Sequence, residues 1–305
     1  MDSDASIERV FYYSPLSFLR AFEKQLSEDF LSGLEAGVGE GHVVRFGNKA
    51  HLFVRRLEWD SRYFKCPIHR IEFADWDQDV SDPAGALAEA MNMLRAQVSD
   101  PDEKSYLFCE IPSEDLPMLQ AMGLAGARLI ETRITYFHDD LKGFDRPVRY
   151  KVRLATEKDI PDLRRTAMRS RNRFDRYHAD PFFPESIADE YMATFVENSV
   201  RGFADLVMVP AEDDGLPGAF FTADLKPLKA ISSEFGIGRI VLVAIGEERR
   251  GWHLRLLSEM SYHFKEREVR VACMTTQSTN RAVIRNCEKL GYKYGRCTHV
   301  FATHF

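Results

Sequence analysis

The segment from Ile240 to Leu257 (IVLVAIGEERRGWHLRLL) combines a buried-type apolar run, two adjacent arginines and one glycine. A strand that ends in a short polar turn and leads into an amphipathic helix directs several backbone N–H groups and the helix N-terminus at one place. Such a place binds anions, and Arg249 and Arg250 could add charge-assisted hydrogen bonds to a phosphate. The segment therefore predicts a phosphate-binding loop, although a solvated turn before an ordinary helix would have the same composition.

The elements around this loop alternate between strands and helices. Thr156 can cap a helix, Pro184 can open a second one, and Arg239–Ile245 is apolar enough to be a central strand buried on both faces. Further elements are expected as strands at 204–209, 218–223, 269–275 and 298–303, and as helices at 254–264 and 280–290. This alternation predicts an α/β sheet covered by helices over residues 150–305.

The first half has a similar pattern of elements. An amphipathic stretch at 18–34 precedes a glycine-rich loop at 37–41, and the segment KGFDRP at 142–147 has the composition of a linker. Between them we expect strands at 51–57, 68–73, 106–111 and 129–137, and helices at 86–98 and 114–122. The predicted divisions are a helical extension at 1–50, an α/β domain at 51–145 and a second domain at 150–305.

One internal similarity links the two halves. Tyr106–Phe137 and Val269–Phe305 each contain a strand, a helix, a glycine step (Met-Gly-Leu or Leu-Gly-Tyr) and a final strand. Glycine is the preferred residue after any helix, so the similarity fits either a structural repeat or that general preference.

Composition narrows the class of protein. The 305 residues include 47 acidic and 41 basic side chains, and 45% are hydrophobic, which is typical of a globular protein and not of a disordered one. A net charge of −6 argues against a nucleic-acid partner, and the longest aliphatic run, 240–245, is too short to span a membrane. The start MDSDASIERV lacks the basic region of a secretory signal, and five scattered cysteines form no zinc motif. We expect a cytoplasmic protein with free thiols and no metal.

The phosphate-binding segment, taken with Asn280, Ala282 and the Lys289–Tyr292 step, resembles the acyl-CoA site of the GNAT superfamily of N-acetyltransferases. In that family an Arg/Gln-x-x-Gly-x-Gly/Ala loop holds the pyrophosphate of CoA. Arg250 fits the first position and Gly251 follows it, whereas His253 and Arg255 stand where small residues are usual. The resemblance implies a GNAT fold with a mixed central sheet flanked by helices, and an N-terminal α/β domain as a partial repeat of it.

More narrowly, residues 55–305 are similar to the branch of this family that acetylates TDP-fucosamine. The similar stretches are 57–61 with Phe64, Arg173-Phe174, Asp180-Pro181 and 197–202. This resemblance implies acetyl-CoA or another acyl-CoA as the donor and a nucleotide-linked amino sugar as the acceptor. It implies cofactor contacts from a set of residues in the second domain: Leu242, Val243, Ala244, Arg249, Arg250, Gly251, Trp252, His253 and Asn280.

The expected reaction needs a donor for the oxyanion and a proton for the leaving thiolate. A backbone N–H at Val243 or Ala244 would polarise the thioester carbonyl. Cys287 stands where related enzymes place a proton-donating tyrosine, but it also fits the apolar face of its helix as a core cysteine. Tyr292 or Tyr294 is the alternative donor, although an aromatic residue at position 292 is more often part of the core. Asn280 could serve only as a helix cap.

The general base and the acceptor contacts are less defined. His178 titrates in the right range, and Glu234, Asp224 or bulk water are alternatives. Arg173, Phe174 and Trp59 are predicted to contact the acceptor, although Trp59 could equally be a core residue. The sequence thus predicts an N-acyltransferase for a nucleotide amino sugar. Acylation of another small amine, a catalytically inactive acyl-CoA-binding module and a homodimer remain open.

Overall fold

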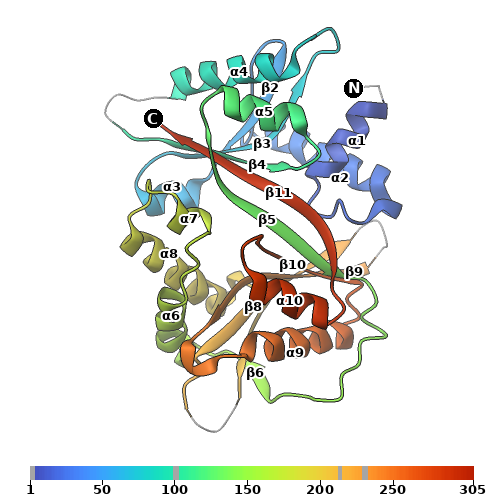
Figure 1. The fold of residues 1–305 in the computed structure, drawn as a ribbon, viewed down its shortest axis with the longest axis vertical. Helices are drawn as coiled ribbons and strands as arrows, with labels where there is room; N and C mark the ends of the chain where they lie inside the picture. The colour runs from blue at the N-terminus through green and yellow to red at the C-terminus, as the bar shows by residue number, and fades with distance from the viewer. Residues whose placement is uncertain (1–3, 99–102, 212–214, 229–232) are drawn as a thin grey trace. The chain divides into compact units, whose positions relative to one another are not determined.

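In the computed structural model, residues 4–98, 103–211, 215–228 and 233–305 are described. The chain divides into two compact units (Figure 1). Unit 1 contains residues 1–133 and 296–305, and unit 2 contains residues 134–295. Among the described residues, no helix is both long and apolar enough to cross a membrane.

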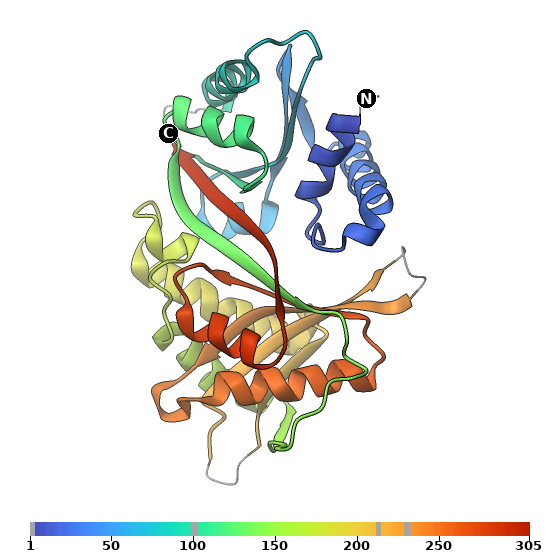
Figure 2. The ribbon, with the colours of Figure 1, turned by 45° about the vertical axis from the view of Figure 1, so that its right-hand side comes forward.

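Unit 1 is a sheet with helices on both faces. Its strands follow the order β1-β2-β3-β4-β11-β5. Helices α4 and α5 pack on one face through a core that includes Leu52, Leu87 and Met118, and α1 and α2 cover the other face around Phe73 (Figure 2). The elements that begin in unit 1 are α1 (Asp4–Tyr13), η1 (Arg20–Phe22), α2 (Glu23–Gly39), β1 (Val44–Phe46), β2 (Ala50–Arg56), α3 (Glu58–Phe64), β3 (Ile68–Trp76), α4 (Pro83–Val98), β4 (Tyr106–Pro112), α5 (Leu116–Leu124) and β5 (Arg128–His138).

Unit 2 has the same layers, with strand order β5-β10-β9-β8-β7-β6. Helices α9 and α10 cover one face through Leu256 and Val283, and α6 and α8 cover the other through Leu163 and Val196. Its remaining elements are β6 (Val152–Leu154), η2 (Glu157–Asp159), α6 (Ile160–Arg169), α7 (Arg176–Ala179), α8 (Glu185–Asn198), η3 (Ser199–Phe203), β7 (Leu206–Pro210), β8 (Ala219–Leu228), β9 (Ser233–Ile245), η5 (Glu247–Arg249), α9 (Trp252–Glu266), β10 (Val271–Gln277), α10 (Arg281–Lys289) and β11 (Lys293–His304).

The antiparallel pair β2–β3 of unit 1 is repeated by β8–β9 of unit 2. The pair Ala50–Trp76 corresponds to Ala219–Ile245, which lies 169 positions later in both strands. The pair Val54–Ile71 corresponds to Ala223–Ile240 with the same shift. Both ladders are interrupted between these pairs, where β3 and β9 each contain one extra residue. Such β-bulges are specific local features, and their common position indicates a structural repeat.

The parallel pairs are repeated as well. Ile68–Ile71 pairs with Tyr106–Cys109, and Ile237–Ile240 pairs with Val271–Met274. Among the described residues the parallel pairing ends there in both units. However, β3 and β9 each continue for five residues, to Trp76 and Ile245, and β4 and β10 each continue for three, to Pro112 and Gln277. In each unit the two strands therefore separate at the same point.

The glycine of the repeat differs from the sequence-based expectation. Gly123 of the Met-Gly-Leu step lies inside α5, whereas Gly126 follows the helix with φ of 69°. Gly291 has φ of 84° and lies 165 positions after Gly126. The N–H groups after both glycines donate to equivalent carbonyls, those of Met122 and Cys287. Gly126 is therefore the counterpart of Gly291, because only this position needs the left-handed conformation that glycine adopts freely.

Three other expectations are corrected by the structure. The glycines at 37 and 39 belong to α2 and form no loop, because the helix continues to Gly39. The first fifty residues pack into unit 1 through Val10, Tyr13 and Leu34, so they are more than an extension. The linker-like segment 142–147 lies inside unit 2, and the division into compact units falls after Arg133 and after Gly295.

Candidate functional site

The open end of unit 2 lies where β9 and β10 separate. Gly246 N–H donates to the Gly218 carbonyl at 2.8 Å, which fixes the alternation of hydrogen bonds along β8 and β9. In this alternation the N–H and C=O groups of Val243 point away from β8. They face the side of β9 on which β10 lies, beyond the last residue pair of that ladder in the described chain. Val243 is half-buried and presents backbone hydrogen-bonding groups to this opening.

The loop after β9 ends at the N-terminus of α9. Gly251 precedes the helix with φ of 92°, a conformation that favours glycine, and an added Cβ would meet nothing within 4 Å. Gly251 has no side chain that could cap the first turn of α9, and in the described part of the chain no side-chain cap is found there. The helix therefore presents free-standing N–H donors and its positive dipole end, which together suit an anion. Arg250, immediately before Gly251, is exposed.

Arg249 has a different role from Arg250. It is 8% exposed, and its Nε donates to the Pro217 carbonyl at 3.1 Å while Nη2 donates to the Leu216 carbonyl at 3.0 Å. These contacts hold the loop before β8 against the loop after β9. Of the two arginines predicted as phosphate ligands, Arg249 is therefore a buried structural residue, and Arg250 is the one exposed to solvent.

His253 lies in the first turn of α9 and is 9% exposed. Burial lowers the pKa of its imidazole to about 4, so the ring is neutral near pH 7. Asn286 Nδ2 lies 3.2 Å from Nδ1 and donates to it, which leaves the proton on Nε2. Nε2 is buried and has no hydrogen-bond partner among the described residues. An orphaned donor beside an uncapped helix terminus is consistent with a ligand there. Its neighbour Trp252 is 3% exposed and belongs to the core.

Three short side chains, which the sequence did not single out, fix the geometry of the opening. Thr222 accepts the Leu242 N–H at the bulge of β9, at 2.9 Å. Ser170 donates to the Ile245 carbonyl at 3.1 Å, and the Asp162 carboxylate accepts the Gly218 N–H at 2.8 Å. Residues of these types are common in strands and helices, so only the three-dimensional contacts identify them.

The side chains predicted near the leaving group are mostly buried. Asn280 caps α10 by accepting the Val283 N–H. Cys287 is fully buried in the core, and burial raises the pKa of its thiol to about 12. Tyr292 is 3% exposed, its hydroxyl is 2.9 Å from Ser261 Oγ, and burial raises its pKa. The interpretation of Cys287 and Tyr292 as core residues therefore explains their surroundings. Of the three side chains considered as proton donors, Tyr294 is exposed.

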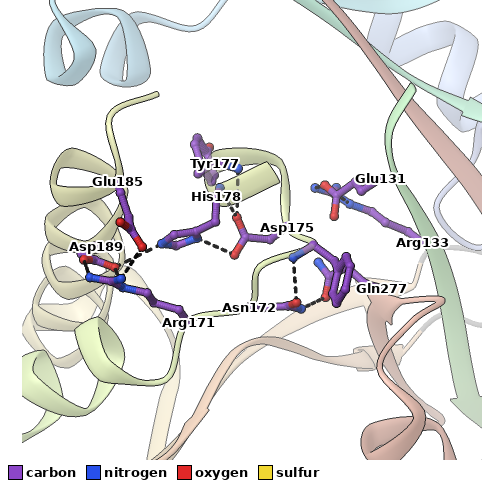
Figure 3. Close-up of polar contacts among 11 residues, drawn as sticks. Glu131, Arg133, Arg171, Asn172, Asp175, Tyr177, His178, Glu185, Asp189 and Gln277 are labelled. Atoms are coloured by element: carbon purple, nitrogen blue, oxygen red, sulfur yellow. Dashed lines mark hydrogen bonds and ion pairs between the residues drawn. The ribbon is translucent and has the colours of Figure 1, made fainter. Parts of the chain in front are cut away.

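His178 lies in a network of charges between α7 and α8 (Figure 3). Nδ1 is 2.8 Å from Asp175 and Nε2 is 3.2 Å from Asp189, whose carboxylate also binds Arg171. Burial alone would lower the pKa of His178, but the hydrogen bonds and charges of Asp175 and Asp189 outweigh burial and raise it. A charged imidazole with both nitrogens engaged has no lone pair with which to accept a proton.

The loop that carries this network also reaches the end of β10. Asn172 donates to Gln277, the last residue of β10 (Figure 3). Arg173 and Phe174 follow and are exposed.

Among the alternative bases, Asp224 is half-buried and burial raises the pKa of its carboxyl, whereas the side chain of Glu234 lies outside the described residues. Trp59, the other residue predicted to contact the acceptor, belongs to α3 of unit 1. It is 38% exposed and stacks on Tyr63, with 5.5 Å between the ring centroids.

The sequence matches no family model and no curated protein. Solved structures, however, share its fold. A GCN5-related N-acetyltransferase from Sphaerobacter thermophilus superposes with a TM-score of 0.58 and 12% identity, over 99% of this chain and 94% of that one. The chain has the GNAT fold.

Two further structures with this fold are informative. A tandem GNAT protein from the clavulanic acid biosynthesis pathway superposes with a TM-score of 0.51 and 13% identity, over 84% of this chain and 78% of that one. A glucosamine N-acetyltransferase region of a fungal multi-domain β-N-acetylglucosaminidase gives 0.54 and 12%, over 83% and 31%. The GNAT fold predicted from the sequence is thus confirmed. None of these comparisons supports the narrower resemblance to enzymes of TDP-linked amino sugars.

Proposed function

We propose that unit 2 transfers an acyl group from acyl-CoA, acetyl-CoA in the simplest case, to the amine of a small molecule. The observation that carries the proposal is the combination of two features at one end of β9. Val243 turns its backbone groups into the gap between the separated strands, and α9, with its uncapped N-terminus, begins nine residues later at Trp252. The first feature suits an extended pantetheine arm and the second suits a pyrophosphate.

Each part of the site has a separate task in this reaction. The Val243 N–H would donate to the thioester oxygen, where negative charge develops as the amine nitrogen forms its bond to the carbonyl carbon. Arg250 and the amides of the first turn of α9 would bind the pyrophosphate. Asn280, which follows β10, would hold the pantetheine arm from the other side of the gap. The C–S bond then breaks, and the thiolate takes a proton from solvent or from the hydroxyl of Tyr294.

The amine must lose a proton to react, and the groups around the opening limit which base can remove it. Both ring nitrogens of His178 are engaged by carboxylates, so we assign it to the loop and leave deprotonation to Asp224 or to water. Because burial raises the pKa of Asp224, its carboxylate is a stronger base than an exposed aspartate, which suits the removal of a proton from the amine.

For the acceptor we propose an amino sugar, in nucleotide-linked form as the first choice. Arg173 and Phe174 support this, because an exposed cation beside an exposed ring suits a phosphate and a sugar or base. Free glucosamine belongs in the same test, since one protein of this fold is named for acetylating it.

The experiment is a measurement of thiol release from acetyl-CoA with TDP- and UDP-amino sugars, glucosamine and unrelated small amines, followed by mass spectrometry of the product. The expected result is an acetylated amino sugar and a KM for acetyl-CoA that rises at least ten-fold in Arg250→Ala. If CoA binds but no amine is acylated, unit 2 is a binding module, the alternative favoured by the burial of Cys287 and Tyr292. If CoA does not bind, both readings fail.

A further inference from the structure

Unit 1 contains the same separated strands as unit 2, so it could in principle hold a second cofactor. The shift of 169 residues makes Ala74 the counterpart of Val243. The Asp77 N–H donates to the Lys49 carbonyl at 2.8 Å, as Gly246 does to Gly218. The Ala74 backbone groups therefore also point away from the antiparallel neighbour and into the gap.

In unit 1 this gap is occupied by a side chain of α1. The guanidinium of Arg9 donates to the Ala74 carbonyl and, through Nε, to Asp115 at 3.1 Å. It also lies 4.0 Å from the centre of the Trp76 ring. Tyr13, one turn further along α1, donates to the same Asp115 carboxylate at 2.6 Å.

Asp115 is the counterpart of a residue of the proposed cofactor site. It caps α5 by accepting the Met118 N–H, as Asn280, 165 positions later, caps α10 by accepting the Val283 N–H. Arg9 thus connects the counterparts of Val243 and Asn280, the two positions between which we propose the pantetheine arm in unit 2.

The pyrophosphate position of unit 1 is also filled from within. Pro83 begins α4 and Trp252 begins α9, again 169 positions apart, so Asp82 is the counterpart of Gly251. The Asp82 carboxylate accepts the Gly85 N–H at 3.0 Å in the first turn of α4. In unit 1 a carboxylate thus takes one of the N–H donors whose counterparts in unit 2 Gly251 leaves open, and Asp77 and Asp79 add two more acidic groups to this loop.

We propose that unit 1 is a self-occupied copy of the acyl-CoA site, in which Arg9 takes the place of the arm and Asp82 that of the pyrophosphate. The chain therefore binds one acyl-CoA, in unit 2, and α1 serves as a permanent internal ligand of unit 1. This inference rests on the function proposed for unit 2.

The test is a calorimetric titration of the full chain with CoA, combined with hydrogen exchange measured with and without CoA. We expect one equivalent, with added protection at residues 242–254 and none at residues 74–85. Gly251→Asp gives unit 2 the acidic group of unit 1 and should weaken binding at least ten-fold. Gly251→Asn is the matched control, since asparagine has the same size and tolerates a positive φ but has no charge, and should weaken binding less.

Two variants of unit 1 complete the design. Arg9→Ala and Asp82→Asn should leave the affinity and location of CoA unchanged, and Arg9→Ala should lower the unfolding temperature. Two equivalents of CoA in the unaltered chain would overturn the inference and leave the proposed function intact. Protection at residues 74–85 with normal binding by Gly251→Asp would overturn both, as would the absence of any CoA binding.

Discussion

At the scale of single residues, the backbone N–H of Val243 is the group on which the proposed chemistry depends most. Val243→Pro removes that N–H, and because the group points away from β8, the β8–β9 ladder loses no hydrogen bond. We expect kcat to fall by about 100-fold, the usual effect of losing one oxyanion donor. Val243→Ala keeps the N–H and should retain most of the activity.

The comparison of these two variants is made by steady-state kinetics after circular dichroism has verified that both are folded. Equal activity of Val243→Pro and Val243→Ala would contradict the role of this amide. A loss in both would instead indicate that the valine side chain is what matters.

Cys287 illustrates how the repeat clarifies a single residue. Its counterpart in unit 1 is Met122, which is also buried and also accepts a hydrogen bond from the residue after the left-handed glycine. A core position in both copies explains the cysteine without catalysis. Cys287→Ala should therefore leave kcat within about two-fold and lower the free energy of unfolding by about 0.5–3 kcal/mol, the common range for core substitutions. A large fall in kcat with normal stability would restore Cys287 as the proton donor.

At the scale of elements, the charge network around His178 should make the stability of the segment between α6 and α8 depend on pH. The pKa of His178 is raised in the folded state, so the stabilisation is complete below the unfolded value of about 6.5. It is lost as the pH rises through the higher folded value. The difference in unfolding temperature between the unaltered chain and His178→Gln should be largest near pH 5.5 and shrink above pH 7.

His263 on α9 provides a control of opposite sign. Burial lowers the pKa of its imidazole, so it contributes stability above the unfolded value, and this contribution is lost as the pH falls through the folded value. The difference for His263→Gln should therefore increase with pH. Parallel pH profiles for the two variants would show that His178 is not held by its carboxylates.

Much of this element structure follows from the sequence, and its limits have physical causes. The apolar run of β9, the glycine before α9 and the Thr156 cap all act locally, so their patterns can be recognised. The bulge of β9 depends on pairing with β8 across the loop between them, and no local pattern encodes it. Arg249 resembles a phosphate ligand in sequence, yet the carbonyls of residues 216 and 217 engage it, and such tertiary contacts are not visible from composition.

At the scale of the whole molecule, the order of the chain differs from the order of the compact units. Residues 296–305 come last in the sequence but belong to unit 1, where Thr298–His304 pairs with Pro112–Tyr106 of β4. The Phe305 carbonyl accepts the Ser105 N–H at 2.8 Å and extends the β4–β11 ladder by one more hydrogen bond. A division at residue 150 would therefore remove a strand from unit 1.

This connectivity makes a prediction that separates the two units. Val300 in β11 is fully buried, and Val300→Ala should destabilise the chain by about 1–2 kcal/mol because it leaves a cavity. Although Val300 follows unit 2 in the sequence, amide exchange should accelerate mainly in β4 and α1, because Val300 pairs opposite Glu110 and faces away from α5, and much less in α9 and β10. Leu256→Ala in α9, whose side chain is also fully buried, is the matched substitution in unit 2 and should show the reverse distribution. Equal acceleration throughout the chain in both variants would mean that the units unfold as one.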